Sequence, residues 1–318
     1  MVNDQQSLNS NQPHPLVSVI VLNWNGGLDT TQCVQSLCNQ EYSSFEIVIV
    51  DNGSTDGSMD LMQESARDER VVLIPSETNL GFSGGNNCGI EYAMSHHAEY
   101  IMLLNNDTLV LDRQLISKMI NVFIHEEQVG LACPTIYHAP PGDRPWYAGA
   151  RYNLWLGGGR HRQSLPPTMD VVDTGYATGC CVMTSRKAIE DVGMLDHDFF
   201  LYQEDVDWSL RMKALGWRVV YNPAASVLHK VSQSSRDRSG KGTYSPNTVY
   251  YKSRSRILLI RKHGNSVQKY VIWPAIIMWE FLLHCTAYAL LGRWAKLRAM
   301  VEGTLAGLRF AIPSHNEE

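Results

Sequence analysis

The sequence predicts an α/β fold with an open, mostly parallel sheet, and three observations lead to that prediction. Two β-branched runs of strand length, Leu16 to Leu22 and Phe45 to Val50, are typical of buried strands. The segment between them, Thr30 to Cys38, carries apolar residues at helical spacing, which completes a βαβ unit. With 44% hydrophobic and 19% charged residues, the 318-residue chain is neither disordered nor fibrous.

The same alternation continues beyond the first unit. We expect a helix from about Ser58 to Arg67, a strand from Val71 to Ile74, a Gly/Asn-rich turn, a helix from about Asn87 to Ser95 and a strand from Tyr100 to Leu104. Strands that alternate with helices in this way favour a parallel sheet.

Polar residues follow three of the predicted strands, namely Asn23, Asp51 and Asp107. Open α/β sheets bind ligands outside the carboxyl ends of their strands. The three side chains therefore converge on one crevice if their strands are neighbours in the sheet.

The second half of the chain predicts a less regular arrangement. The stretch from Pro134 to Pro167 is rich in Pro, Gly and aromatic residues and predicts a long, partly mobile loop beside the site. The block from Thr178 to Leu228 predicts a short strand, two helices and a strand, with Glu204 and Asp205 at the start of the second helix.

Charge separates the C-terminal part from the rest. The residues after position 250 hold ten Lys or Arg against four acids, a balance of +6, while the first 250 residues carry −11. A basic segment suggests an anionic partner such as lipid headgroups or a phosphorylated ligand, and solvated helix faces are the alternative. We expect one helix from Thr248 to His263 and a long one from about Pro274 onward.

The apolar stretch from Tyr270 to Leu291 leaves three interpretations open. It is a buried or dimer-forming helix, an amphipathic helix in the plane of a membrane, or a true span, against which Pro274, Glu280 and His284 argue.

Compartment and domain limits follow from simpler features. Seven cysteines, an odd number without paired Cys-x-x-Cys spacing, favour reduced thiols in a cytosolic protein. Residues 1–15 are polar, lack the apolar core of a signal peptide and predict a disordered lead-in. We divide the remainder into a domain over 16–232 and a basic, apolar helical region over 233–318.

Several acids are candidates for chemistry, each with a structural alternative. Adjacent carboxylates at Glu204, Asp205 and Asp207 can raise one another's pKa toward that of a general base, or can simply favour a helix N-terminus. Asp107 can hold a hard divalent cation or be an ordinary loop residue. His229 can add an imidazole ligand or satisfy a local hydrogen bond.

The nucleotide-binding candidates are equally open from the residues alone. Asp51 can accept hydrogen bonds from ribose hydroxyls or a base N–H, or can cap the turn that follows it. The Gly-rich segment from Asn79 to Gly89 lets backbone approach a nucleotide closely, but it lacks the GxGxxG spacing of dinucleotide sites. The chain also lacks the GxxxxGK[ST] phosphate loop, which excludes the usual ATPase and kinase classes.

Taken in order, five segments resemble the family 2 glycosyltransferases of the GT-A fold, over roughly residues 16 to 232. They are VSVIVLNWNG (17–26), VDNGSTDGS (50–58), NLGFSGGNNCGI (79–90), LLNNDT (103–108) and FFLYQEDVDWSLR (199–211). The resemblance is greatest to the bacterial branch that includes rhamnosyltransferases of O-antigen and cell-wall polysaccharide. It implies a Rossmann-like nucleotide-binding sheet with a fused acceptor-binding part.

The resemblance also implies roles for individual residues. The nucleotide would contact Asn23, Asp51, Asn79, Gly81, Asn86 and Asn106. A divalent metal, Mn²⁺ or Mg²⁺, would be bound by Asp107, at the last position of a DxD-like motif, and by His229. Asp205 would be the catalytic base, with Glu204 beside it near the acceptor.

We therefore expect an inverting glycosyltransferase that moves a sugar, such as L-rhamnose from a dTDP- or UDP-linked donor, to a saccharide or lipid-linked acceptor. The expected location is the cytoplasm or the inner membrane face, with peripheral membrane association or a homodimer through the C-terminal region, and no nucleic-acid partner. A sugar-nucleotide nucleotidyltransferase and a non-catalytic nucleotide-sugar-binding subunit of a membrane assembly are the alternatives. The acids at 204–207 argue against a mere binding subunit, because binding needs no general base.

Overall fold

A mixed sheet forms the centre of the structure, a computed structural model that describes residues 14–139, 144–230 and 244–311. In these ranges the strands are β1 (Val17–Asn23), β2 (Phe45–Asn52), β3 (Val71–Ser76), β4 (Tyr100–Asn105), β5 (Thr108–Leu109), β6 (Val129–His138), β7 (Pro145–Tyr147), β8 (Ala150–Asn153), β9 (Gly158–His161), β10 (Val172–Asp173), β11 (Cys181–Ser185) and β12 (Arg218–His229). The predicted lead-in falls largely on residues 1–13, and the predicted domain boundary falls within 231–243; both lie outside the described residues.

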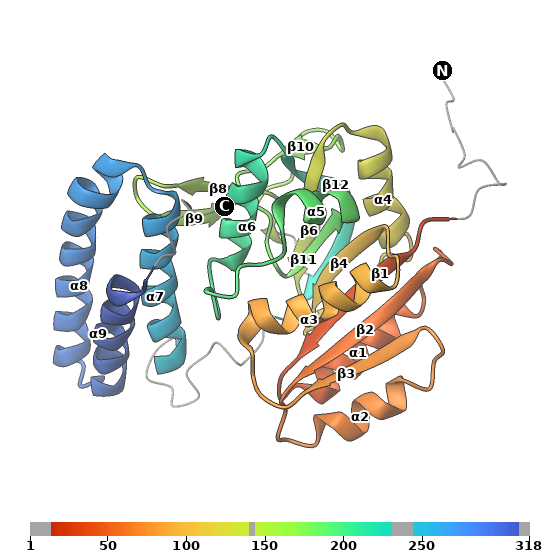
Figure 1. Cartoon of the computed structure of the whole chain (residues 1–318), viewed down its shortest axis with the longest axis horizontal. Coiled ribbons are helices and arrows are strands. Elements are labelled where there is room, and N and C mark those ends of the chain that lie inside the picture. The colour runs from red at the N-terminus through yellow and green to blue at the C-terminus, as the bar shows by residue number, and fades with distance from the viewer. Residues whose placement is uncertain (1–13, 140–143, 231–243, 312–318) are drawn as a thin grey trace.

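The helices of the described ranges alternate with these strands and then follow them (Figure 1). They are α1 (Gly27–Leu37), α2 (Ser58–Ser65), α3 (Gly81–Ser95), α4 (Leu115–His125), α5 (Arg186–Val192), α6 (Glu204–Ala214), α7 (Pro246–His263), the π-helical turn η2 (Gln268–Ile272), α8 (Trp273–Leu290) and α9 (Trp294–Arg309). The predicted alternation is confirmed. The sequence assigned no element to the residues between β4 and residue 134. These residues form β5, α4 and most of β6.

Strand order explains where the site lies. The sheet runs β10-β12-β6-β11-β4-β1-β2-β3, and the four neighbours β4, β1, β2 and β3 are parallel. The chain leaves β1 toward β2 and later returns on the other side of β1 as β4, which creates the switch point where such sheets bind ligands. Asn23 pairs in register with Asp51, so the predicted neighbours are confirmed.

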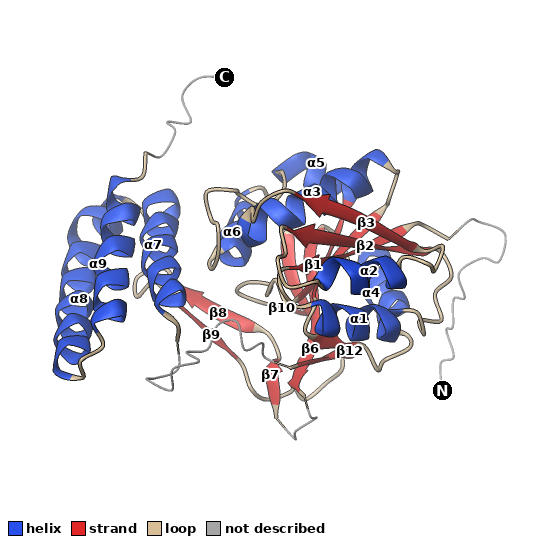
Figure 2. Ribbon diagram, turned by 90° about the horizontal axis from the view of Figure 1, so that it is seen from below, coloured by secondary structure: helices blue, strands red, loops and turns tan. Residues whose placement is uncertain are grey.

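Helices cover both faces of this sheet (Figure 2), with α3, α5 and α6 on one face and α1, α2 and α4 on the other. The strands are buried on both faces, and Val19, Ile47 and Ile101 are fully buried. This explains why they are continuous apolar runs in the sequence rather than alternating ones.

The predicted start of α3 is wrong by six residues. The sequence favoured a Gly-rich turn before a helix at Asn87, whereas the helix begins at Gly81 and includes the glycines. Glycine weakens an isolated helix, but here a Cβ on Gly85 or Gly89 would lie about 2.5 Å or less from the side chains of Leu22 and Ile20. Close packing of α3 on β1 therefore selects these glycines.

The prediction of a long loop from Pro134 to Pro167 is also wrong for the described part of that stretch. It contains the end of β6, the short strand β7 and a hairpin of β8 and β9, while residues 140–143 lie outside the description. Because the hairpin pairs only with itself, its strands are short and the sequence shows no clear alternation.

The C-terminal region forms three helices rather than the two predicted, since Gly292 adopts a left-handed conformation between α8 and α9. Leu258 and Leu259 of α7 belong to the main core, and α9 packs closely on α7. Helix α8 packs mainly on α9 and is largely exposed (Figure 1). Burial of α8 within its own chain is therefore wrong for these residues.

Candidate active site

The ends of β1, β2 and β4 meet in a buried network of polar side chains. Asn23 donates from Nδ2 to Asp51 Oδ1 at 2.9 Å and to Ser54 Oγ at 3.0 Å. Asn106 donates to Thr30 Oγ1 at 3.0 Å and approaches Asn23 Oδ1 at 3.4 Å. The structure thus brings together three predicted nucleotide-site residues, Asn23, Asp51 and Asn106.

Ser54 and Thr30 complete this network and were not identified from the sequence. Ser54 Oγ donates to Asp51 Oδ1, and Thr30 Oγ1 donates to Asn23 Oδ1 at 2.7 Å. The repeated hydroxyls of the segment 54–58 were the available signal for Ser54. Thr30 lies in an ordinary amphipathic helix, and nothing in the surrounding sequence indicated that its hydroxyl would join the site.

Asp107, which follows β4, and His229, the last residue of β12, lie side by side. The short strand β5 pairs antiparallel with the end of β12, so that His229 stands opposite Thr108. As a result, His229 Nε2 lies 3.1 Å from Asp107 Oδ1, and both side chains are buried. Neighbouring residues of the DxD-like motif thus diverge, with Asn106 facing Asn23 and Asp107 facing His229.

The Asp107–His229 pair fits a divalent cation. Asp107 Oδ2 and His229 Nδ1 are buried without a hydrogen-bond partner. A carboxylate oxygen and an imidazole nitrogen are both ligands that such a cation accepts, and Asp107 Oδ1 and His229 Nε2 are close enough to bind the same ion. Over the described residues no three His, Cys, Asp or Glu side chains gather in a metal-binding group, so protein ligands alone do not complete a coordination shell.

The acids at the start of α6 form the second half of the site. Glu204 is buried, and Asp205 accepts hydrogen bonds from the backbone N–H groups of Gly179, at 3.2 Å, and Val206, at 2.8 Å. Burial raises the pKa of Asp205 to about 6, although its backbone hydrogen bonds oppose this shift. Burial and the neighbouring Asp205 charge raise the pKa of Glu204 well above its usual value.

A backbone link joins Asp205 to the end of β4, next to the predicted nucleotide-binding residue Asn106. Gly179 donates to Asp205, and the next residue, Cys180, accepts from the N–H of Asn105 at 2.9 Å. The link exists because β11 runs antiparallel to β4, which places residue 180 beside the DxD-like motif. A carboxylate with a raised pKa is therefore joined through Gly179 and Cys180 to the end of β4, which leads into Asp107.

Asp207 has a structural role instead, because both of its partners are side chains of the protein. Its carboxylate accepts from Arg211 Nε at 2.8 Å and lies 2.7 Å from His263 Nε2 of α7. Of the three acids in the predicted cluster, only Glu204 and Asp205 are left for chemistry.

Buried polar atoms without a hydrogen-bond partner identify further candidate ligand contacts. Among the described residues, five buried side-chain polar atoms lack a hydrogen-bond partner. Two belong to Asp107 and His229, and the others are Tyr152 Oη, Gln203 Oε1 and Glu204 Oε2. Such atoms cost about 1–3 kcal/mol each when left unsatisfied, so each of them is a candidate contact for a ligand.

Backbone strain and electrostatics support this placement. Tyr202 and Gln203 both have positive φ directly before Glu204, a conformation that costs energy and gathers at functional sites. Tyr152, on β8, packs edge-on against Tyr176, and burial raises the pKa of both tyrosines, with a further contribution from the Asp205 charge. Tyr152 and Gln203 were not predicted, because a tyrosine in an aromatic-rich stretch carries no specific signal.

The Gly-rich segment has a structural role in the described contacts. Asn79 Oδ1 accepts from Asn52 Nδ2 and from the N–H of Gly81, and Asn86 donates to Phe82 O within its own helix. Gly81 has a φ of +76°, and a Cβ there would lie 2.4 Å from Phe200 O. The segment joins β2 to the loop that precedes Glu204; direct contact of Asn79, Gly81 or Asn86 with a nucleotide stays a prediction.

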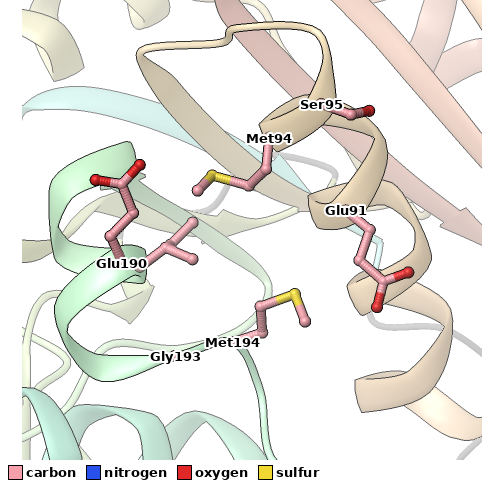
Figure 3. A pocket seen from close by; sticks show the side chains of 7 residues that line it. Glu91, Met94, Ser95, Glu190, Gly193 and Met194 are labelled. Carbon is pink, nitrogen blue, oxygen red and sulfur yellow. The ribbon is translucent and has the colours of Figure 1, made fainter.

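A separate hollow of about 550 Å³ lies between α3 and α5. Figure 3 shows Met94 and Met194 extending into it, while the carboxylates of Glu91 and Glu190 point away. It adjoins the C-terminal half of α3, whereas the predicted residues gather at that helix's N-terminal end. None of the predicted site residues lines this hollow.

The fold and this crevice define a class of protein, the GT-A glycosyltransferases. The mannosyltransferase PcManGT from Pyrobaculum calidifontis, solved with GDP-Man and Mn²⁺, shares the fold with a TM-score of 0.58. The two chains are 15% identical, over 94% of this chain and 88% of that one.

The sequence family is equally clear. Residues 18–193 match the glycosyl transferase family 2 model, and the chain belongs to that family. It is 26% identical to the dTDP-rhamnosyl transferase RfbF of Shigella flexneri over 68% of this chain and 71% of that protein. It is 24% identical to the N-acetylglucosaminyl-diphospho-decaprenol L-rhamnosyltransferase of Mycobacterium tuberculosis over 83% and 88%. The chain is therefore a sugar-transferring enzyme, as predicted, rather than a nucleotidyltransferase or a binding subunit.

Proposed function

We propose that this enzyme transfers L-rhamnose from dTDP-L-rhamnose, with inversion, to a saccharide on a lipid-linked acceptor during synthesis of a cell-surface polysaccharide. The observation that carries the proposal is the half-buried Asp205 carboxylate, which has a raised pKa and accepts from the N–H of Gly179, the residue before the Cys180–Asn105 backbone contact. The names of the Shigella and Mycobacterium relatives support rhamnose as the sugar, and that of the latter supports a diphospho-lipid acceptor.

The donor would lie across the switch point of the sheet. Asn23, Asp51 and Asn106 would contact the nucleoside and its ribose through their amide and carboxylate groups. Asp107 and His229 would hold a divalent cation, Mn²⁺ or Mg²⁺, whose remaining ligands come from the donor diphosphate and water. When bound, that cation neutralises charge on the departing diphosphate.

Asp205 would act as the general base. Its carboxylate takes the proton of an acceptor hydroxyl while that oxygen attacks the anomeric carbon and the bond from that carbon to the diphosphate oxygen breaks. The proton ends on Asp205, the electron pair of the broken bond leaves with dTDP, and a single displacement inverts the anomeric centre. A pKa of about 6 leaves Asp205 ionised at neutral pH yet basic enough to accept a proton.

The unpartnered groups beside Asp205 would orient the acceptor sugar. The hydroxyl of Tyr152 can donate and accept, Gln203 Oε1 accepts, and a protonated Glu204 can donate from its carboxyl group. Sugar hydroxyls supply both donors and acceptors and match this set. We place the reaction on the cytoplasmic side of a membrane, where a lipid-linked acceptor is within reach.

The test is a calorimetric binding panel of dTDP, UDP and GDP with and without Mn²⁺, followed by transfer from dTDP-L-rhamnose to a short-chain N-acetylglucosaminyl-diphospho-lipid. We expect metal-dependent binding of dTDP and a rhamnosylated product with an inverted linkage. Preference for GDP would contradict the donor, absence of transfer with tight dTDP binding would contradict the acceptor, and pyrophosphate release from dTTP would contradict the reaction class.

A further inference from the structure

Helix α8 presents an apolar stripe along its outward side. Seven residues repeat at spacings of three and four and share one face of the helix, and all are exposed: Ala275, Met278, Trp279, Leu282, Leu283, Thr286 and Leu290. We call this set the α8 stripe. A helix of 18 residues is about 27 Å long, so the stripe extends along one whole side of the C-terminal region.

Nothing in the described chain covers the α8 stripe. Helix α8 lies at the edge of the molecule farthest from the sheet (Figures 1 and 2), and its packing is mainly against α9. The segment Gln268–Leu290 is the one described helix that is long and apolar enough to cross a membrane, and only 6% of its apolar 18-residue window is buried. An apolar helix left exposed to water marks an interaction surface.

Charge around the α8 stripe indicates the kind of partner. Residues 251–311 hold ten Lys or Arg and two acids, Glu280 and Glu302. Each acid is paired within the chain, Glu280 with Arg256 and Glu302 with Arg298, and Lys262 pairs with Asp196 of the main domain, so seven of the ten basic residues lie outside these three pairs. Basic residues also stand just beyond the two ends of α8, Lys269 before it and Arg293 after it. A surface that is apolar and basic fits anionic lipid headgroups above an acyl layer.

Aromatic residues lie at both ends and in the middle of the same apolar stretch. Tyr270 and Trp294, at opposite ends of the apolar stretch, and Trp279 in its middle are all more than half exposed. Tyrosine and tryptophan favour the membrane–water interface because one part of the ring is apolar and another is polar.

A second copy of the chain fits the α8 stripe less well. In an antiparallel symmetric pairing, Lys269 of one copy would meet Arg293 of the other, and in a parallel pairing each residue would meet its own equivalent. Both arrangements bring like charges together, whereas anionic headgroups satisfy both residues at once.

The remaining question is whether α8 spans the bilayer or lies in its plane. One side of α8 is covered by α9, which in turn packs on α7, and α7 contributes Leu258 and Leu259 to the main core. Glu280 and Arg256 also pair between α8 and α7. Only the outward side is free for lipid, which corresponds to a helix lying in the membrane interface.

We propose that the α8 stripe docks this enzyme onto an anionic lipid bilayer with α8 in the plane of the interface. Two contacts connect this helix region to the acceptor side. Trp273 donates from Nε1 to Leu154 O at 3.0 Å, and Arg256 donates to Gly157 O at 2.9 Å, both in the turn of the hairpin that carries Tyr152. Docking therefore holds that hairpin near the bilayer, where a lipid-linked acceptor resides.

The experiment is vesicle flotation of the full chain, which needs neither donor nor acceptor and so is independent of the proposed reaction. Vesicles of pure phosphatidylcholine are compared with vesicles containing 30 mol% phosphatidylglycerol. We expect the wild type to float with the anionic vesicles, and Trp279→Glu and Leu283→Glu to reduce the bound fraction about tenfold or more. Leu111→Glu is the matched control, because Leu111 is equally exposed but lies before α4, and it should float like the wild type.

Three outcomes would overturn the proposal. The wild type remains in the bottom fraction with both vesicle types, both stripe variants float unchanged, or light scattering shows a dimer in vesicle-free buffer that Leu283→Glu converts to a monomer. The last result would assign the α8 stripe to a second copy. Circular dichroism of each variant separates loss of docking from loss of folding.

Discussion

Asp107 Oδ1 lies 3.1 Å from His229 Nε2, although the two residues follow different strands in distant parts of the sequence. The other polar atom of each side chain is buried without a partner. This pairing depends on β5, a strand of two residues that pairs with the end of β12. The arrangement leads to the first of five predictions.

Asp107→Ala and His229→Ala should each weaken Mn²⁺-dependent binding of dTDP by roughly tenfold to a hundredfold, because each removes one protein ligand from the cation. Titration calorimetry with and without Mn²⁺ measures the effect. Binding without metal should change little. Equal loss with and without Mn²⁺ would show that these residues contact the nucleotide or support the fold instead.

Asp205→Asn should lower kcat by roughly 10²–10⁴-fold and leave the Kd of dTDP nearly unchanged, since the amide cannot accept the proton of the acceptor hydroxyl. Steady-state transfer and calorimetry provide the two readouts. Asp191→Asn, at an exposed acid of α5, is the control and should keep full activity. Retained turnover in Asp205→Asn would remove this residue from the role of base.

The rate should depend on pH through the same residue. Because burial raises the pKa of Asp205 to about 6, the base is ionised above that pH and protonated below it. We expect kcat/KM for the acceptor to fall as pH decreases through about 6. A profile that stays flat between pH 5 and 8 would contradict this assignment.

Tyr152→Phe should raise the KM of the acceptor by about threefold to tenfold without changing the Kd of dTDP, because it removes one hydrogen bond to a sugar hydroxyl and keeps the ring. Tyr92→Phe, on α3 where the ring stacks on His96 and packs against the core, is the matched control. An acceptor KM identical to that of the wild type would exclude Tyr152 from acceptor binding.

Gly81→Ala should reduce the free energy of unfolding by roughly 2–4 kcal/mol, since it adds both a left-handed backbone conformation and a clash with Phe200 O. Gly57→Ala shares the positive φ but has nothing within 4 Å, so it should cost only about 1–2 kcal/mol. Urea unfolding compares the two variants. Equal losses would show that the contact with Phe200 contributes nothing.

Much of the donor side could be predicted from the sequence. The strands that end at Asn23, Asn52 and Asn105 are buried on both faces, so their apolar runs are continuous and their polar ends are conspicuous. The same local reasoning placed Glu204 and Asp205 at the start of α6. It could not place the start of α3. The destabilising effect of glycine on a helix can be judged from the local sequence, but the close packing of Gly85 against Leu22 depends on a distant strand.

The sequence by itself thus determined the α/β alternation, the motifs and the family, because these depend on residue types over short spacings. The tertiary structure decided the rest. It brought His229 to Asp107 through β5, set Asp205 beside Gly179, placed Tyr152 on a hairpin within electrostatic range of Asp205, and left α8 exposed. These relationships depend on pairings between distant segments, and local propensity contains no information about which distant segments will meet.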